Sequence, residues 1–160
     1  MAEQRVKLLC LNYHQLSHHN WVKGAKRTVK IIIMVEPVAK ARARTIVTKG
    51  GKYHSYTPPK TAHTEAMIRE AVIGSEYFEA GIPLKLEATF YRVKPKSTPK
   101  RVTLPTSRPD WDNYGKLLTD ALEKFVYAND SQITTALIKK RFGSPPRIEL
   151  TIEVDVDVLR

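Results

Sequence analysis

The sequence predicts an α+β fold, a single domain in which a mixed β-sheet carries two main helices packed on one face. Three observations lead to this prediction. Residues 147–158 alternate apolar and mostly polar or charged side chains, the pattern of a half-buried strand. Residues 28–35 hold a continuous apolar run typical of a buried strand. Residues 117–126 carry apolar side chains at the spacing of a helix with one buried face.

Composition limits the classes of protein to which the chain can belong. With 160 residues, of which 42% are hydrophobic, it has the size of one domain with an ordinary core. It contains no run of eighteen apolar residues, so we expect no transmembrane helix. Its single cysteine, Cys10, excludes an internal disulfide. We therefore expect an intracellular, soluble protein.

The net charge of +11 and the isoelectric point near 9.8 favour a polyanionic partner. Positive residues gather in two acid-free stretches, 37–60 and 92–108. Lysines and arginines separated by small residues can each reach a different phosphate. A merely basic, well-solvated surface is the competing interpretation. The expected phosphate contacts are Lys40, Arg42, Arg44, Lys49, Lys52, Lys60, Lys94, Lys96, Lys100, Arg101 and Arg108.

The first half of the sequence predicts an extension, a strand, a basic loop with a hairpin, and a helix, in this order. Residues 1–28 have poor periodicity and are interpreted as an N-terminal extension of uncertain structure, with residues 29–160 as the main domain. Cys10 lies four residues before His14 and eight before His18, but a structural zinc site needs a fourth ligand. The strand at 28–35 leads into a basic loop with a hairpin about Gly50-Gly51. A helix follows, with Thr57 as N-cap and Gly74 at its end.

The second half predicts a long loop, a central helix and three strands. Residues 84–93 alternate as a half-buried strand, and the proline-rich stretch 94–109 is a long loop of functional character. The central helix begins near Asp112 and runs to about residue 126. Residues 132–142 and 147–158 are the last two strands, and we expect them to form an antiparallel pair.

Aspartates at the start of the central helix give the main functional hypothesis. Asp110 and Asp112 lie side by side before the helix, and Asp112 or Asn113 is its natural N-cap. Asp130 opens a later strand, and if that strand runs back beside the helix start, three carboxylates converge. Such a cluster makes sense around a hard divalent ion, magnesium or manganese. The alternative is that the aspartates only cap the helix.

The stretch R-P-D-W-D-N-Y-G-K, followed by D-A-L and later N-D-S-Q-I, resembles the RusA family of Holliday junction resolvases. The resemblance covers roughly residues 30–155 and extends upstream to a basic motif at 38–44 and to Y-T-P at 56–58. Family members often have proline where this chain has Ala41 and Ala43. The resemblance implies a RusA-like fold. It also implies a bacterial or phage-encoded protein that acts in the cytoplasm, at the nucleoid.

The resemblance also implies the chemistry and the partner. It assigns Asp110, Asp112 and Asp130 as magnesium ligands, with Lys116 as the catalytic lysine. Asp120 is expected as a further ligand or as a partner of Lys116, with Asn113 as a supporting residue. A homodimer would cut a four-way DNA junction by paired symmetric nicks, in DNA recombination and repair. The alternatives are a non-catalytic basic protein that binds branched DNA, and a nuclease for flaps or other branched ends.

Overall fold

The computed structural model describes residues 27–156, so the expected extension, except for its last two residues, lies outside the described part. In chain order the elements are β1 (Thr28–Ile33), β2 (Arg44–Val47), β3 (Tyr53–Tyr56), α1 (Pro59–Val72), β4 (Leu84–Arg92), α2 (Trp111–Leu122), the 3-10 turn η1 (Asp130–Gln132), β5 (Ile133–Phe142) and β6 (Arg147–Val154). None of the described helices is long and apolar enough to cross a membrane.

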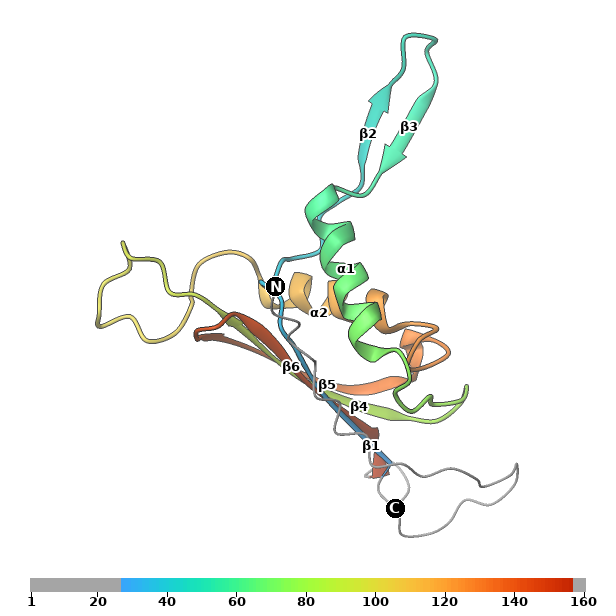
Figure 1. Cartoon of the computed structure of the whole chain (residues 1–160). Coiled ribbons are helices and arrows are strands. Elements are labelled where there is room, and N and C mark those ends of the chain that lie inside the picture. Colours follow the sequence, from blue (N-terminus) through green and yellow to red (C-terminus); the bar gives the residue numbers. More distant parts are fainter. Residues whose placement is uncertain (1–26, 157–160) are drawn as a thin grey trace, which may run out of the picture.

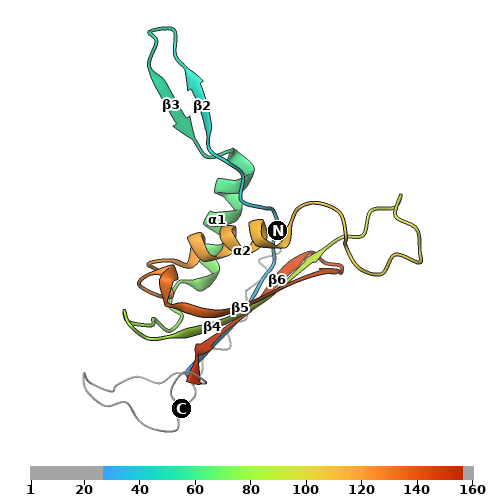
Figure 2. The same ribbon diagram turned by 180° about the vertical axis from the view of Figure 1, so that it is seen from behind.

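Four of the strands form one mixed sheet in the order β1-β6-β4-β5. Strand β6 is antiparallel to β1 and to β4, whereas β5 runs parallel to β4. Both helices lie on one face of this sheet, as Figures 1 and 2 show from opposite sides. The predicted α+β class, the mixed sheet and the placement of both helices on one face are confirmed.

The expected pairing of the last two strands is wrong, because β4 lies between them. Alternation identifies a strand but does not order strands in a sheet. The chain leaves β5 and crosses the end of β4 at Gly143, whose N–H donates to the Arg92 carbonyl at 3.0 Å. A Cβ on Gly143 would lie 2.7 Å from the ring of Tyr91, so only glycine fits this crossing.

Burial of alternate residues fixes how α2 lies on the sheet. Leu84, Leu86, Ala88 and Phe90 of β4 are at most 1% exposed and face the helices. Tyr114 of α2 stacks on Phe90, with ring centroids 4.9 Å apart. One residue later, a Cβ on Gly115 would approach Ile138 of β5 to 3.3 Å. The start of α2 therefore packs closely on β4 and β5.

Two helix boundaries differ from the prediction. The N-cap of α1 is Pro58, and Thr57 makes no cap bond. Helix α2 ends at Leu122, four residues early, because Lys124 adopts a positive φ of 69° that a continuing helix excludes. Phe125, counted in the apolar stripe, is 43% exposed beyond that turn. The hairpin about Gly50-Gly51 is confirmed as β2 and β3.

Candidate active site

Asp110 and Asp112 lie at the start of α2 with both side chains exposed. The N-cap is Asp110, in extended conformation, and its side chain makes no cap hydrogen bond. Asp112, in the first turn, accepts one long contact of 3.5 Å from the side-chain amide of Asn113. The prediction that Asp112 or Asn113 caps the helix is wrong. Neither carboxylate bonds the free N–H groups at the helix start, so both remain available for a cation or a substrate.

Two cations hold the backbone of the loop that leads to Asp110. The ammonium of Lys140 donates to the carbonyls of Ser107, at 3.1 Å, and Pro109, at 2.8 Å. The guanidinium of Arg92 donates to the carbonyl of Arg108 at 2.9 Å. Three successive carbonyls are thus fixed from the ends of β5 and β4. Sequence reasoning missed Lys140, since only its register opposite Phe90 places it on the helix-covered face of the sheet.

Asp130 lies at the opposite end of α2, so the expected meeting of three carboxylates within one chain is wrong. Helix α2 has 12 residues and is about 18 Å long. Near its far end, Tyr127 donates its hydroxyl to the Thr119 carbonyl at 3.0 Å, and Asp130 follows three residues later. Residues 27–156 contain no group of three or more acidic, histidine or cysteine side chains that could hold a metal ion.

The geometry of β5 explains this separation. The strand does run back toward the start of α2, as the prediction required, but Asp130 precedes it. The residue that β5 delivers to the aspartate loop is therefore Lys140. Around Asp130, a reciprocal capping box joins Asn129 and Gln132, and the amide of Gln132 also donates to the carbonyls of Glu79 and Ile82.

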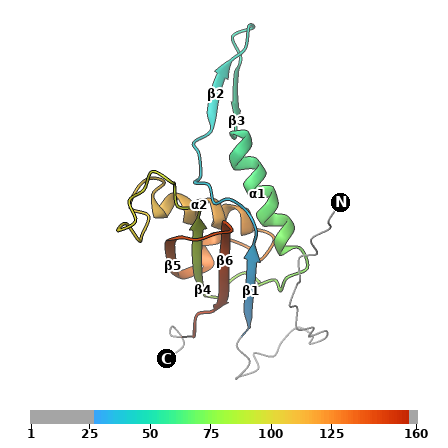
Figure 3. The ribbon, with the colours of Figure 1, turned by 60° about the vertical axis from the view of Figure 1, so that its left-hand side comes forward.

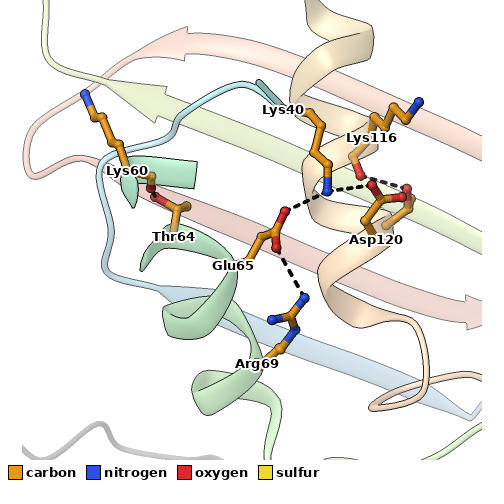
Figure 4. A network of polar contacts seen from close by, with 8 residues as sticks. Lys40, Lys60, Thr64, Glu65, Arg69, Lys116 and Asp120 are labelled. Atoms are coloured by element: carbon orange, nitrogen blue, oxygen red, sulfur yellow. Dashed lines mark hydrogen bonds and ion pairs between the residues drawn. The ribbon is translucent and has the colours of Figure 1, made fainter. Parts of the chain in front are cut away.

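Lys116 and Asp120 occupy successive turns of α2, one and two turns after Asp112. Lys116 is exposed, and its side chain extends away from Asp120 (Figure 4). Asp120 instead forms an ion pair of 2.8 Å with Lys40, whose ammonium also lies 2.7 Å from Glu65 of α1. The expected pairing of Asp120 with Lys116 is therefore replaced by a pairing with Lys40.

Lys40 links three segments around the site. Partial burial lowers the pKa of Lys40, but hydrogen bonds and charge from Asp120 and Glu65 outweigh this, so its pKa lies above the ordinary value. Arg69 completes the network by contacting Glu65 at 3.3 Å (Figure 4). The backbone N–H of Lys40 donates to the Asn113 carbonyl at 2.9 Å. The segment before the hairpin is thereby fixed to the first turn of α2.

Most of the predicted DNA contacts lie on two projections that start beside the aspartates. The β2–β3 hairpin extends away from the body of the molecule, and so does the loop at 94–108 (Figures 1 and 3). Arg42, Lys49, Lys52, Lys96, Lys100, Arg101 and Arg108 are exposed on these projections or at their bases, and Lys60 is exposed in the first turn of α1. Arg44 belongs to β2, but its side chain is not described. Lys94 turns inward, donating to the Lys100 carbonyl and lying over Phe142.

Comparison with known proteins matches the chain to a family model and to relatives in bacteria and phage. The sequence model of a family described as "Endodeoxyribonuclease RusA" matches residues 35–153. An uncharacterized protein, YqaN of Bacillus subtilis, is 31% identical over 137 residues, which are 78% of this chain and 94% of YqaN. A crossover junction endodeoxyribonuclease of Lactococcus phage r1t is 43% identical over 79 residues, 48% of this chain and 59% of that relative.

Proposed function

Since this chain belongs to the RusA family and is an endodeoxyribonuclease, we propose that it resolves four-way DNA junctions by paired symmetric nicks. The phage relative carries the name crossover junction endodeoxyribonuclease, which supports the choice of substrate. We assign the activity to residues 29–160 and interpret residues 1–28 as an extension. We further propose that the protein acts in DNA recombination and repair, in a bacterial cytoplasm at the nucleoid.

The exposed carboxylates of Asp110 and Asp112 carry the proposal. A helix start normally uses an Asp side chain to bond its free N–H groups, and these two are not used in that way. Exposed carboxylate oxygens that do not cap the helix suit magnesium, with manganese as a substitute. A bound magnesium ion would activate water and neutralise charge on the phosphate during hydrolysis.

The surrounding residues have separate proposed roles. Lys140 and Arg92 hold the loop carbonyls, so they keep Asp110 in place while DNA binds. Lys116, exposed one turn after Asp112, is the cation that we assign to the charge developing on the phosphate. Lys40 neutralises Asp120 and Glu65. We therefore propose that Asp120 supports the site through Lys40 rather than as a metal ligand.

A homodimer gives Asp130 a place in this scheme. Its separation from Asp110 and Asp112 by the length of α2 supports a site to which a second copy contributes Asp130. A two-fold dimer also provides the two equivalent sites that two symmetric cuts need. The partners that we propose are therefore a second copy of the chain and branched DNA.

A panel of labelled DNA forms tests the proposed function. The purified chain is incubated with a four-way junction, a flap and a linear duplex, each with and without magnesium. We expect paired, symmetric nicks in the junction that require magnesium. Cutting of the flap in preference to the junction would make the chain a different branch-specific nuclease. Tight junction binding without nicks under magnesium or manganese would refute a catalytic role of the aspartates.

A further inference from the structure

A pocket of about 360 Å³ lies beside the aspartate loop, and the proposed function leaves it without a role. Its walls come from four separate parts of the chain: the segment between β1 and β2, the start of α1, the end of β4 and the start of α2. Pro109, the residue before Asp110, forms part of one wall. Whatever fills the pocket therefore lies next to the carboxylates that we assign to catalysis.

Two residues that are buried overall present their hydroxyl groups to this pocket. Tyr114 is 2% exposed and Thr61 is 3% exposed, and both line the pocket. Neither hydroxyl makes a hydrogen bond within residues 27–156. In that part of the chain, Ser75 Oγ is the side-chain atom that is both fully buried and without a partner. The hydroxyls of Tyr114 and Thr61 are therefore still accessible to solvent. A ligand that fills the pocket would shield both hydroxyls from water, so it must offer them hydrogen-bond partners of its own.

The remaining lining selects a flat, neutral group over a free anion. Most of the wall is aliphatic, made by Pro37, Val38, Ala39, Ala41, Pro58 and Pro109. Glu36 also lines it, and its carboxylate would repel a phosphate in the same space. Arg92 and Lys60 supply positive charge beside these walls. Apolar walls with a few polar groups suit an unstacked base, and the two cations suit its phosphate.

We propose that the pocket receives one unstacked nucleobase of the DNA substrate next to the cut, and that Tyr114 and Thr61 hydrogen-bond its edge. The proposal rests on the proposed function, because it places the base beside the scissile phosphate. A phenol carries its proton at neutral pH, so the Tyr114 hydroxyl can donate to the edge of a base. The pocket would then give the nuclease a base preference at one position.

Fluorescence of 2-aminopurine tests whether a base leaves the stack. Four-way junctions carrying this analogue at successive positions from the branch are mixed with the chain in EDTA. We expect a fluorescence rise of several-fold at one position. Ala41→Phe fills the pocket and should abolish the rise, whereas Ala62→Phe, on an exposed position of α1 outside the pocket, should keep it. A complex with no rise at any position, or a rise that survives Ala41→Phe, overturns the proposal.

Mapping of cut sites in junctions with varied sequence provides a second test with smaller substitutions. Tyr114→Phe and Thr61→Val each remove one hydroxyl and keep the shape of the wall. We expect each to reduce the base preference about tenfold, the size of a lost buried hydrogen bond. Cleavage with unchanged preference in both variants refutes the pocket and leaves the proposed function standing. A chain that neither binds nor cuts branched DNA refutes both.

Discussion

The two ends of α2 use their polar side chains in opposite ways. At its start, Asp110 and Asp112 are exposed and take no part in capping the helix. Beyond its far end, Asn129 and Gln132 form a complete capping box, and Gln132 ties it to two more carbonyls. An unused cap forgoes about 1 kcal/mol of stability. The start of α2 therefore sacrifices stability to keep two carboxylates free, whereas the far end uses its polar groups to hold the fold.

The largest effect that tests this contrast is the loss of a carboxylate at the start of α2. Asp112→Asn removes a proposed metal ligand without removing any contact to the DNA backbone. We expect junction cleavage to fall by more than about a hundredfold, because loss even of a supporting group at a metal site costs up to that much. Junction affinity, measured by gel shift in EDTA, should be retained. Normal nicking by purified Asp112→Asn would remove this end of α2 from the chemistry.

Asp130 sharpens the comparison, since it is an exposed acid at the end that we interpret as structural. Asp130→Asn and Asp112→Asn should each be inactive alone. In a mixture that exchanges subunits, half of the dimers carry both variants. If a second copy supplies Asp130, one of the two sites in each mixed dimer is intact, and about a quarter of the wild-type nicking returns, as single nicks.

The control for this mixture is the double variant Asp112→Asn/Asp130→Asn, combined with either single variant. It cannot assemble a complete site in any arrangement, so it should stay inactive. Continued inactivity of the mixed single variants, with subunit exchange verified by tagged chains, would refute a site shared between copies.

The sequence predicted most elements because alternation and apolar stripes report burial of single segments. Strands β4 and β6, the hairpin and the face of α2 that carries Leu117 and Leu118 follow from local pattern alone. The aspartate pair was identified in the same way. The early end of α2 was not predicted, because nothing in the sequence distinguishes a lysine that adopts a positive φ, as Lys124 does.

The errors of placement share one cause, which is that pattern does not fix how segments are placed relative to one another. The position of β4 between β5 and β6 depends on packing across the whole sheet. That order sends Lys140 to the aspartate loop and leaves Asp130 at the far end. The ion pairs of Lys40 with Asp120 and Glu65, which are distant in sequence, could not be predicted from its basic neighbours, and its contact with DNA stays a prediction.

The free energy of unfolding should depend on the far end of α2 and hardly on its start, the reverse of the effect expected for cleavage. Gln132 is 8% exposed and bonds three backbone groups, so Gln132→Leu removes the side-chain partner of the Asn129 N–H and of the Ile82 carbonyl, and one of two donors to the Glu79 carbonyl. We expect a loss of about 2 kcal/mol, which lowers the melting temperature by roughly 4–8 °C. Asp110→Ala removes no cap bond and should change stability by less than about 0.5 kcal/mol. Thermal unfolding followed by circular dichroism measures both, and equal losses would contradict the comparison.

The smallest effect concerns lysines that lie at each end. Lys49 and Lys52 are exposed on the hairpin, whose base is fixed to the first turn of α2, whereas Lys124 lies beyond the far end with 68% of its side chain exposed. If DNA binds at the start of α2, Lys49→Ala or Lys52→Ala should each reduce the salt dependence of binding by about 0.9 per lost phosphate contact. Lys124→Ala changes the net charge equally but should leave that slope intact. Fluorescence anisotropy of a labelled junction at several salt concentrations separates these cases. Equal reductions of the salt dependence in all three variants would mean that binding depends only on the total charge of the protein. The hairpin would then lose its assignment as a DNA-binding element.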